Sequence, residues 1–174
     1  HDGTALLLAA AMPTGAPQVD PGLSGSRMWQ NDHIEFRILP DPSDPERQVQ
    51  VILAADGRVW HNEHWSGPPP KPDHERTGEG WRIAARLPFT ALGFEPPEAG
   101  TAPLELRGLV AATDWSQGWP DIALATPARL LFSHADRFAT WKLHPTAADS
   151  APRPPVGLEA LRFPQALLRE GDNA

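Results

Sequence analysis

The sequence contains no cysteine and no tyrosine among its 174 residues. Without cysteine the chain has no disulfide framework, no thiol nucleophile and no thiolate metal ligand. Its net charge of −7 comes without a cluster of Lys and Arg, which nucleic acid binding requires because phosphates must be neutralised. The same charge balance disfavours anionic membrane surfaces, and no apolar run reaches the roughly 18 residues that span a bilayer. We therefore expect neither nucleic acid nor a membrane as a partner.

Proline and glycine are frequent instead, with 21 and 14 residues, and they leave no room for a long amphipathic helix before residue 155. The segments between them are short and carry alternating apolar residues. We therefore predict an all-β fold, an antiparallel β-sandwich of the jelly-roll or immunoglobulin-like kind. The predicted strands are Thr4–Ala10, Asp32–Leu39, Gln48–Ala54, Trp81–Leu87, Leu104–Ala112, Ala128–Phe132 and Phe138–Leu143, and Asp56-Gly57 marks a hairpin to a short partner that ends at Trp60.

The alternation gives several of these strands one apolar and one polar face. It predicts one sheet with an apolar inner face and an outer face rich in Glu, Gln and Arg, whose side chains can hydrogen-bond hydroxyl groups in pairs. Ordinary solvated strands have the same outer composition. The apolar sets are Val49, Val51 and Leu53; Ile83, Ala85 and Leu87; and Leu104, Leu106 and Val110, and the intervening polar residues include Gln48, Gln50, Arg82, Arg86, Glu105 and Arg107.

The entry to the second predicted strand combines an indole with amide and acidic side chains. Trp29 is followed by Asn31, Asp32 and Glu35 within seven residues. A pyranose ring offers an apolar C–H face to an indole and a rim of hydroxyl groups to carboxylates and amides. We therefore predict that these four residues bind a mono- or oligosaccharide.

Tryptophan is the other unusual feature, with 7 residues in a chain without tyrosine. Several lie in loops rich in glycine, proline and polar residues, where burial is hard to arrange, so that they indicate a ligand. Trp115 and Trp119 are such loop residues. We add both to the candidate ligand-binding residues, together with Gln50 and Arg107 of the polar strand faces.

Catalysis and metal binding find little support in the sequence. A retaining glycosidase needs two carboxylates about 5 Å apart. Asp32 and Glu35 lie three apart on a strand and so on opposite faces, which excludes them as such a pair. The segment Gly22–Ser26 has no strand-to-helix setting of a nucleophile elbow. His61 and His64 have no third ligand at a defined position, so incidental loop histidines are the simpler interpretation. We expect a non-catalytic protein without a resident cofactor.

Three segments together resemble the family 9 carbohydrate-binding modules and the wider group of related DOMON domains. They are Asp2–Leu8, Trp29–Glu35 and Trp81–Phe89 with the following Leu92-Gly93, in the order and spacing of the family over roughly residues 1 to 132. The resemblance implies a β-sandwich with a groove over one sheet, in which two tryptophans clamp a sugar. By position, Trp29 matches the first clamp and Glu35 an acidic residue that hydrogen-bonds sugar hydroxyls. The second clamp lies in a late loop, where we prefer Trp119 to Trp115.

Other positions depart from the family pattern. Gln50 stands where the family has a basic residue, and Ala111 where it has a glutamine. The resemblance also implies a structural calcium, but no Asp/Asn-rich calcium loop stands out in the sequence, and proline makes Asp41-Pro42-Ser43-Asp44 a poor match to one. Haem-binding relatives of the fold imply a further alternative, with Met28 as an axial ligand.

The chain divides into three parts by composition. We expect a sandwich over residues 1–143, a proline-rich linker over 144–156, and a C-terminal segment over 157–174 that resembles the start of a following β domain. This organisation favours an accessory piece of a larger, glycan-active protein that is secreted, periplasmic or at the cell surface, with other domains of the same polypeptide as partners. Two alternatives stay open: an interaction or spacer domain that has lost its sugar site, and a haem-binding domain.

Overall fold

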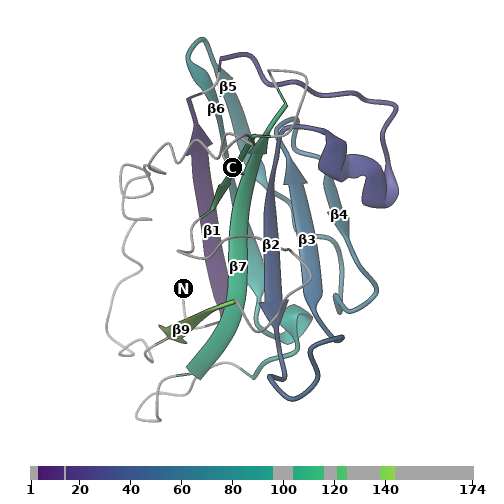
Figure 1. The fold of residues 1–174 in the computed structure, drawn as a ribbon, viewed down its shortest axis with the longest axis vertical. Helices are drawn as coiled ribbons and strands as arrows, with labels where there is room; N and C mark the ends of the chain where they lie inside the picture. The colour runs from purple at the N-terminus through teal and green to yellow at the C-terminus, as the bar shows by residue number, and fades with distance from the viewer. Residues whose placement is uncertain (1–3, 14, 96–103, 116–120, 125–137, 144–174) are drawn as a thin grey trace, which may run out of the picture.

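The computed structural model describes residues 4–13, 15–95, 104–115, 121–124 and 138–143. Within them two antiparallel sheets pack against each other (Figure 1). The smaller sheet has the order β1 (Ala5–Met12), β6 (Gly80–Pro88), β5 (Asp73–Thr77). The larger sheet has the order β4 (Val59–His61), β3 (Val49–Ala54), β2 (His33–Leu39), β7 (Leu104–Asp114), β8 (Asp121–Leu124), and β9 (Ala139–Leu143) also pairs with β7. The predicted all-β, antiparallel sandwich is confirmed.

Strand β7 organises the larger sheet because it has different partners along its two edges. One edge pairs with β2, and the other is shared between β9 near its start and β8 near its end. Gly108 lies where β7 meets both β2 and β9. A Cβ atom at this position would lie 2.5 Å from the Trp141 ring and 2.9 Å from the Arg37 carbonyl oxygen, so only glycine fits between them.

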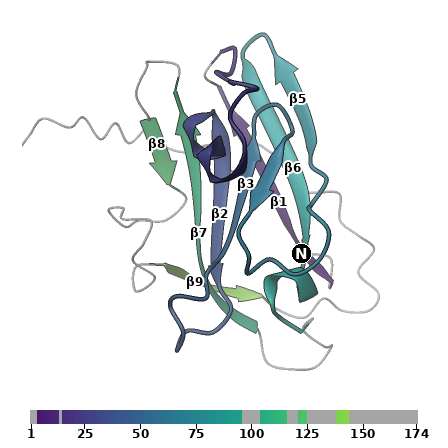
Figure 2. The same ribbon diagram turned by 90° about the vertical axis from the view of Figure 1, so that its right-hand side faces the viewer.

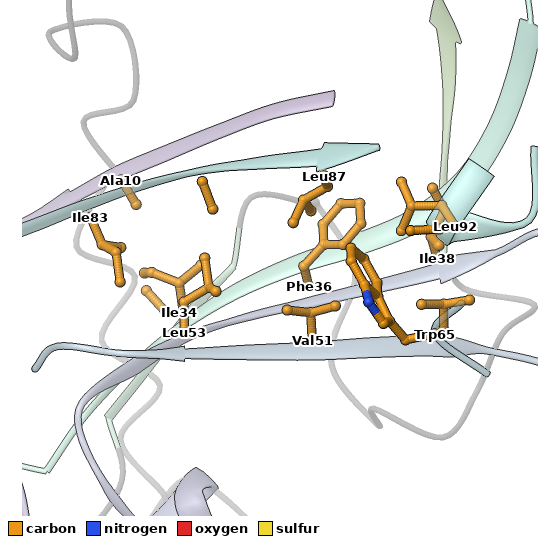
Figure 3. Packing of buried hydrophobic residues seen from close by; sticks show 14 of the residues in the cluster. Ala10, Ile34, Phe36, Ile38, Val51, Leu53, Trp65, Ile83, Leu87 and Leu92 are labelled. Atoms are coloured by element: carbon orange, nitrogen blue, oxygen red, sulfur yellow. The ribbon is translucent and has the colours of Figure 1, made fainter. Parts of the chain in front are cut away.

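The core lies between the sheets and follows from the alternation (Figure 3). Phe36 of β2 stacks on Trp141 of β9 with ring centroids 6.0 Å apart, and Trp65 is buried with its indole N–H donating to the Pro68 carbonyl at 3.1 Å. Burying a large apolar side chain contributes about 1.5–3 kcal/mol, so this layer stabilises the sandwich. The larger sheet adds Ile34, Ile38, Val49, Val51, Leu53 and Leu106, and the smaller sheet Ala10, Met12, Trp81, Ile83, Ala85 and Leu87.

Most predicted strands appear within one or two residues of their expected bounds, and a 3₁₀ turn, η2 (Thr90–Leu92), follows β6 and is closed by Gly93 with φ 84°. One prediction is wrong: Trp81–Leu87 does not share a sheet with the strands at 48–54 and 104–112, because β6 lies in the smaller sheet. Strands of two facing sheets show the same alternation of apolar and polar residues, so the pattern cannot tell to which sheet a strand belongs. Strands β5 and β8 were not predicted. The predicted strand Ala128–Phe132 and residues 144–174 lie outside the described residues.

Candidate functional site

A short 3₁₀ turn, η1 (Gly25–Gln30), lies on the outer side of the larger sheet, away from the smaller one (Figure 2). Met28 attaches it there, because its buried side chain packs against Ile52, Ala54 and Trp60 of the two strands below. The next residue, Trp29, has 45% of its surface exposed. The turn therefore presents one indole to solvent.

Trp29 is joined by Trp115, which follows the last residue of β7. The ring centroids are 5.7 Å apart and the planes are inclined by 47°. The indole N–H of Trp115 donates to the Trp29 carbonyl at 3.1 Å, so this contact links residues 86 positions apart in the sequence. Such a distance and tilt are typical of favourable aromatic pairs. We call Trp29 and Trp115 the indole pair.

Asn31 and Asp32 are fully buried directly behind the indole pair. Asp32 Oδ1 accepts from the Trp115 backbone N–H at 2.6 Å, and Oδ2 accepts from the Gln18 N–H at 2.8 Å. Asn31 Oδ1 accepts from the Asp20 N–H at 2.6 Å. Burial raises the pKa of Asp32 above its ordinary value, although the two N–H donors oppose this. These two predicted site residues therefore fix the backbone that carries the indoles.

Glu35 is buried on the outer face of β2, where the alternation placed it. Its Oε1 accepts from Arg37 Nε at 2.5 Å and from Gln50 Nε2 at 2.7 Å. Burial alone would raise the pKa of Glu35, but His33 and Arg37 outweigh this effect and hold the pKa below its ordinary value. The group is therefore an ionised carboxylate already oriented by a cation and an amide. We call Glu35, Arg37 and Gln50 the carboxylate network.

His33 lies on the same face between the indole pair and the carboxylate network. Its Nδ1 is 2.6 Å from the Asn31 carbonyl, which can only accept, so Nδ1 carries a proton. Its Nε2 lies 3.9 Å from Glu35 Oε2. Within the described part of the chain, His33 Nε2 and Asn31 Nδ2 are buried without a hydrogen-bond partner. Gln48 Oε1 and Trp81 Nε1 are in the same state, and few buried polar atoms of a protein are left so.

The structure brings some of the predicted site residues together and separates others. Arg107 lies opposite Leu39, four residues along β2 from Glu35, or about 13 Å at the rise of an extended strand. It is therefore not part of the carboxylate network. Trp119 lies outside the described residues. Sequence reasoning missed Arg37 and His33 as site residues, although both share the outer strand face with Glu35.

The other chemistries considered from the sequence find no site in the described residues. Met28 packs in an apolar cluster, where its thioether fills space instead of facing a haem. No group of three His, Cys, Asp or Glu side chains that could hold a metal ion occurs in the described ranges, so they do not supply a carboxylate set for calcium. His61 packs against the Trp65 ring, with centroids 5.8 Å apart. None of the helical segments described has the length and apolar character needed to cross a bilayer.

Comparison with known proteins gives a fold but no close relative. No protein-family model matches the sequence, and the curated proteins contain no significant match. Among solved structures, a family 9 carbohydrate-binding module from Caldicellulosiruptor kristjanssonii is similar in two complexes. The complex with cellotriose has a TM-score of 0.60 and 12% identity, covering 88% of this chain and 76% of that one. The complex with glucose has a TM-score of 0.59 and 13% identity, covering 86% and 76%.

A candidate carbohydrate-binding protein from Bacteroides uniformis is also similar, with a TM-score of 0.55 and 17% identity, covering 82% of this chain and 74% of that chain. At these identities the likeness concerns the fold alone. The β-sandwich implied by the resemblance to family 9 modules is therefore confirmed.

Proposed function

We propose that this domain binds a mono- or oligosaccharide on the outer face of the larger sheet. The observation that carries the proposal is that the indole pair and the carboxylate network lie on one face, with His33 between them. An apolar stacking surface beside fixed hydrogen-bonding groups is the combination that a pyranose requires. The similarity of the fold to modules solved with glucose and cellotriose supports the same assignment.

The spacing of the indole pair decides how a sugar can meet it. A sugar ring held between two indoles needs about 3.5–4 Å on each side, or about 7–8 Å between the rings. Trp29 and Trp115 are 5.7 Å apart, so they form one continuous surface on which a sugar stacks. We propose Trp119 as the opposing clamp, and the Glu35 carboxylate with the partly exposed Arg37 and Gln50 side chains that hold it as the groups that bond the hydroxyls.

Asp32 and Arg107 take other roles in this proposal. Asp32 holds the Trp115 backbone in place, and Arg107 lies too far along the sheet to share a single sugar unit with Glu35. An oligosaccharide that extends along the strand direction would reach Arg107. The meeting of Trp29 and Trp115 also favours binding over the alternative of a spacer domain that has lost its site.

We further propose that the domain is non-catalytic and serves as an accessory part of an exported, glycan-active protein. Glu35 is engaged by Arg37 and Gln50, whereas a general acid needs a raised pKa and a second carboxylate at a defined distance. Turnover of a chromogenic glycoside that disappears in Glu35→Gln would contradict this part of the proposal.

Isothermal titration with glucose and cellotriose tests the binding. We expect a Kd between micromolar and millimolar, which corresponds to about 4–8 kcal/mol. Trp29→Ala should remove most of the affinity because it deletes the exposed half of the stacking surface. Leu7→Ala is the matched control, since Leu7 is 46% exposed but lies on the smaller sheet, and it should bind like the parent. Unchanged affinity in Trp29→Ala would show that the sugar binds elsewhere.

A further inference from the structure

The side chain of Arg58, the residue directly before β4, is surrounded by oxygen acceptors as a bound metal cation would be. Its Nε donates to Asp56 Oδ2 at 2.6 Å. Its terminal nitrogens donate to three backbone carbonyls of a single loop, those of Leu23 at 2.7 Å, Asp20 at 3.0 Å and Pro21 at 3.3 Å. A guanidinium has five N–H donors in a rigid fork, and bonds from a charged donor are stronger than neutral ones. Arg58 therefore holds the loop Asp20–Leu23 in one conformation.

The hairpin that presents Arg58 is itself rigid. Asp56 Oδ1 accepts from the Arg58 backbone N–H at 3.1 Å, so this carboxylate holds both the backbone and the side chain of Arg58. Gly57 has φ 85°, and a Cβ atom there would lie 2.5 Å from the His74 ring. The turn therefore requires glycine, and it fixes the backbone from which the Arg58 side chain extends.

The loop that Arg58 holds leads directly into the turn that carries Trp29. It ends two residues before Gly25, the first residue of η1. Its other end is tied to the exit of the same turn, because the Asp20 N–H donates to Asn31 Oδ1. Arg58 thus fixes the entry to η1, while Asn31 and Asp32 fix its exit.

We propose that Arg58 is a positioning residue for the indole pair: it serves as a built-in cation that sets the position of Trp29 against Trp115. It makes no contact with the indoles and acts through the loop Asp20–Leu23. Lysine cannot replace it fully, because an ammonium group lacks the planar fork that reaches several carbonyls at once. The inference rests on the proposed function only for its effect on sugar affinity, since the geometry of the pair exists without ligand.

Circular dichroism provides a readout of that geometry. Two indoles in contact couple their electronic transitions and give a pair of far-ultraviolet bands of opposite sign, which we define as the signal that Trp115→Phe removes. Arg58→Gln should lose most of this signal and weaken cellotriose binding roughly 5- to 10-fold. Arg58→Lys should retain an intermediate signal. Arg82→Gln is the matched control, because Arg82 pairs with Glu75 on the smaller sheet, and it should keep the full signal.

Chemical rescue separates positioning from general stability. Adding methylguanidinium to Arg58→Ala should restore the dichroism signal, because the freed carbonyls and Asp56 can accept from a free guanidinium. A folded Arg58→Gln with the full signal would overturn the proposal, even if its Tm were lower. If Arg58→Gln does not fold, Arg58→Lys decides: an undiminished signal overturns the proposal and a reduced one supports it.

The two proposals can fail separately. A parent protein that binds neither glucose nor cellotriose, but whose dichroism signal depends on Arg58, contradicts the assigned ligand and supports the role of Arg58. Parent-like affinity and signal in Arg58→Gln contradict the role of Arg58 and leave the sugar site in place.

Discussion

The outer faces of the two sheets carry the same kind of ion pair in different surroundings. On the smaller sheet, the side chains of Arg82 and Glu75 are 50% and 52% exposed. On the larger sheet, those of Arg37 and Glu35 are 20% and 6% exposed. Exposed pairs contribute about 0–1 kcal/mol, whereas burying charges costs several kcal/mol that the pairing only partly repays. The pair on the smaller sheet belongs to an ordinary solvated face, and the buried pair is the one that we assign to the proposed sugar site.

The exposed apolar residues follow the same division. Leu7 and Trp29 are exposed almost equally, at 46% and 45%. Leu7 faces outward from β1 on the smaller sheet, opposite Arg86 of β6, as scattered surface residues often do. Trp29 contacts a second indole and lies over buried polar groups. The two residues therefore differ in their neighbours, and exposure alone does not distinguish them.

The largest difference between the two sheets should appear when Glu35 and Glu75, the acidic residues of the two ion pairs, are each replaced in a separate variant. Glu35→Ala leaves Arg37 and Gln50 without their shared acceptor in a mostly buried setting, so we expect a loss of about 2–3 kcal/mol in the free energy of unfolding. Glu75→Ala should cost less than about 1 kcal/mol. Urea unfolding of both variants measures the difference. Equal losses would show that the buried network is no more demanding than a surface pair.

A second variant tests the buried support of the indole pair. Asp32 accepts two backbone N–H groups, one from each oxygen. Asp32→Asn keeps the shape but turns an NH₂ group toward one of these donors, so that one buried N–H loses its acceptor. Removing the desolvated charge offsets part of this, and we expect a loss of about 1–2 kcal/mol.

The same urea unfolding experiment measures this loss. Asn62 provides the control, because its side chain bonds Gln50 N and the Gln48 carbonyl away from the indoles. Asn62→Asp should lower stability without changing the dichroism signal of the indole pair, whereas Asp32→Asn should change both. A parent-like signal in Asp32→Asn would contradict the role assigned to Asp32.

The strands were predictable where one face of each is buried, because burial imposes the alternation that the sequence shows. Strand β5, Asp73–Thr77, was missed for the converse reason: its residues are all exposed, so no apolar pattern marks it. Strand β5 forms because it pairs with β6 in the folded sheet, which is a tertiary effect. The assignment of β6 to a separate sheet also depends on packing, which alternation does not encode.

Part of the candidate site was named from the sequence. Trp29 and Glu35 were predicted from their residue types and spacing, Trp115 from its loop and Gln50 from its strand face, and their contact with a ligand stays a prediction. The contact between Trp29 and Trp115 depends on Asp32, which joins the start of β2 to the end of β7 through the Trp115 backbone. Asn31 and Asp32 were predicted as sugar ligands because their side chains suit hydroxyl groups. Such side chains suit backbone N–H groups equally, and only the fold decides which they meet.

The smallest effect that we expect concerns Glu35 and Asp32, the two buried acids of the larger sheet. Their contributions to stability should depend on pH in opposite directions. The pKa of Glu35 lies below its ordinary value of 4.5, so its charge stabilises the fold above that pH, and this contribution is lost as the pH falls through the folded-state pKa. The pKa of Asp32 lies above its ordinary value of 3.8. Its contribution has the opposite sign: it is present below that pH and is lost as the pH rises through the folded-state pKa.

Glu35→Gln retains an acceptor for Arg37 and Gln50 but has no charge to lose. Its stability deficit relative to the parent should therefore be constant at neutral pH and shrink as the pH falls below 4.5, since the parent then loses its advantage. The deficit of Asp32→Asn should instead grow on acidification, because the parent regains stability as Asp32 takes up a proton. Urea unfolding midpoints of the three proteins across this range measure both trends. A Glu35→Gln deficit that stays constant into the acid range would mean that the carboxylate network does not hold Glu35 in its ionised form, and the contrast with the solvated pair on the smaller sheet would then lose its electrostatic basis.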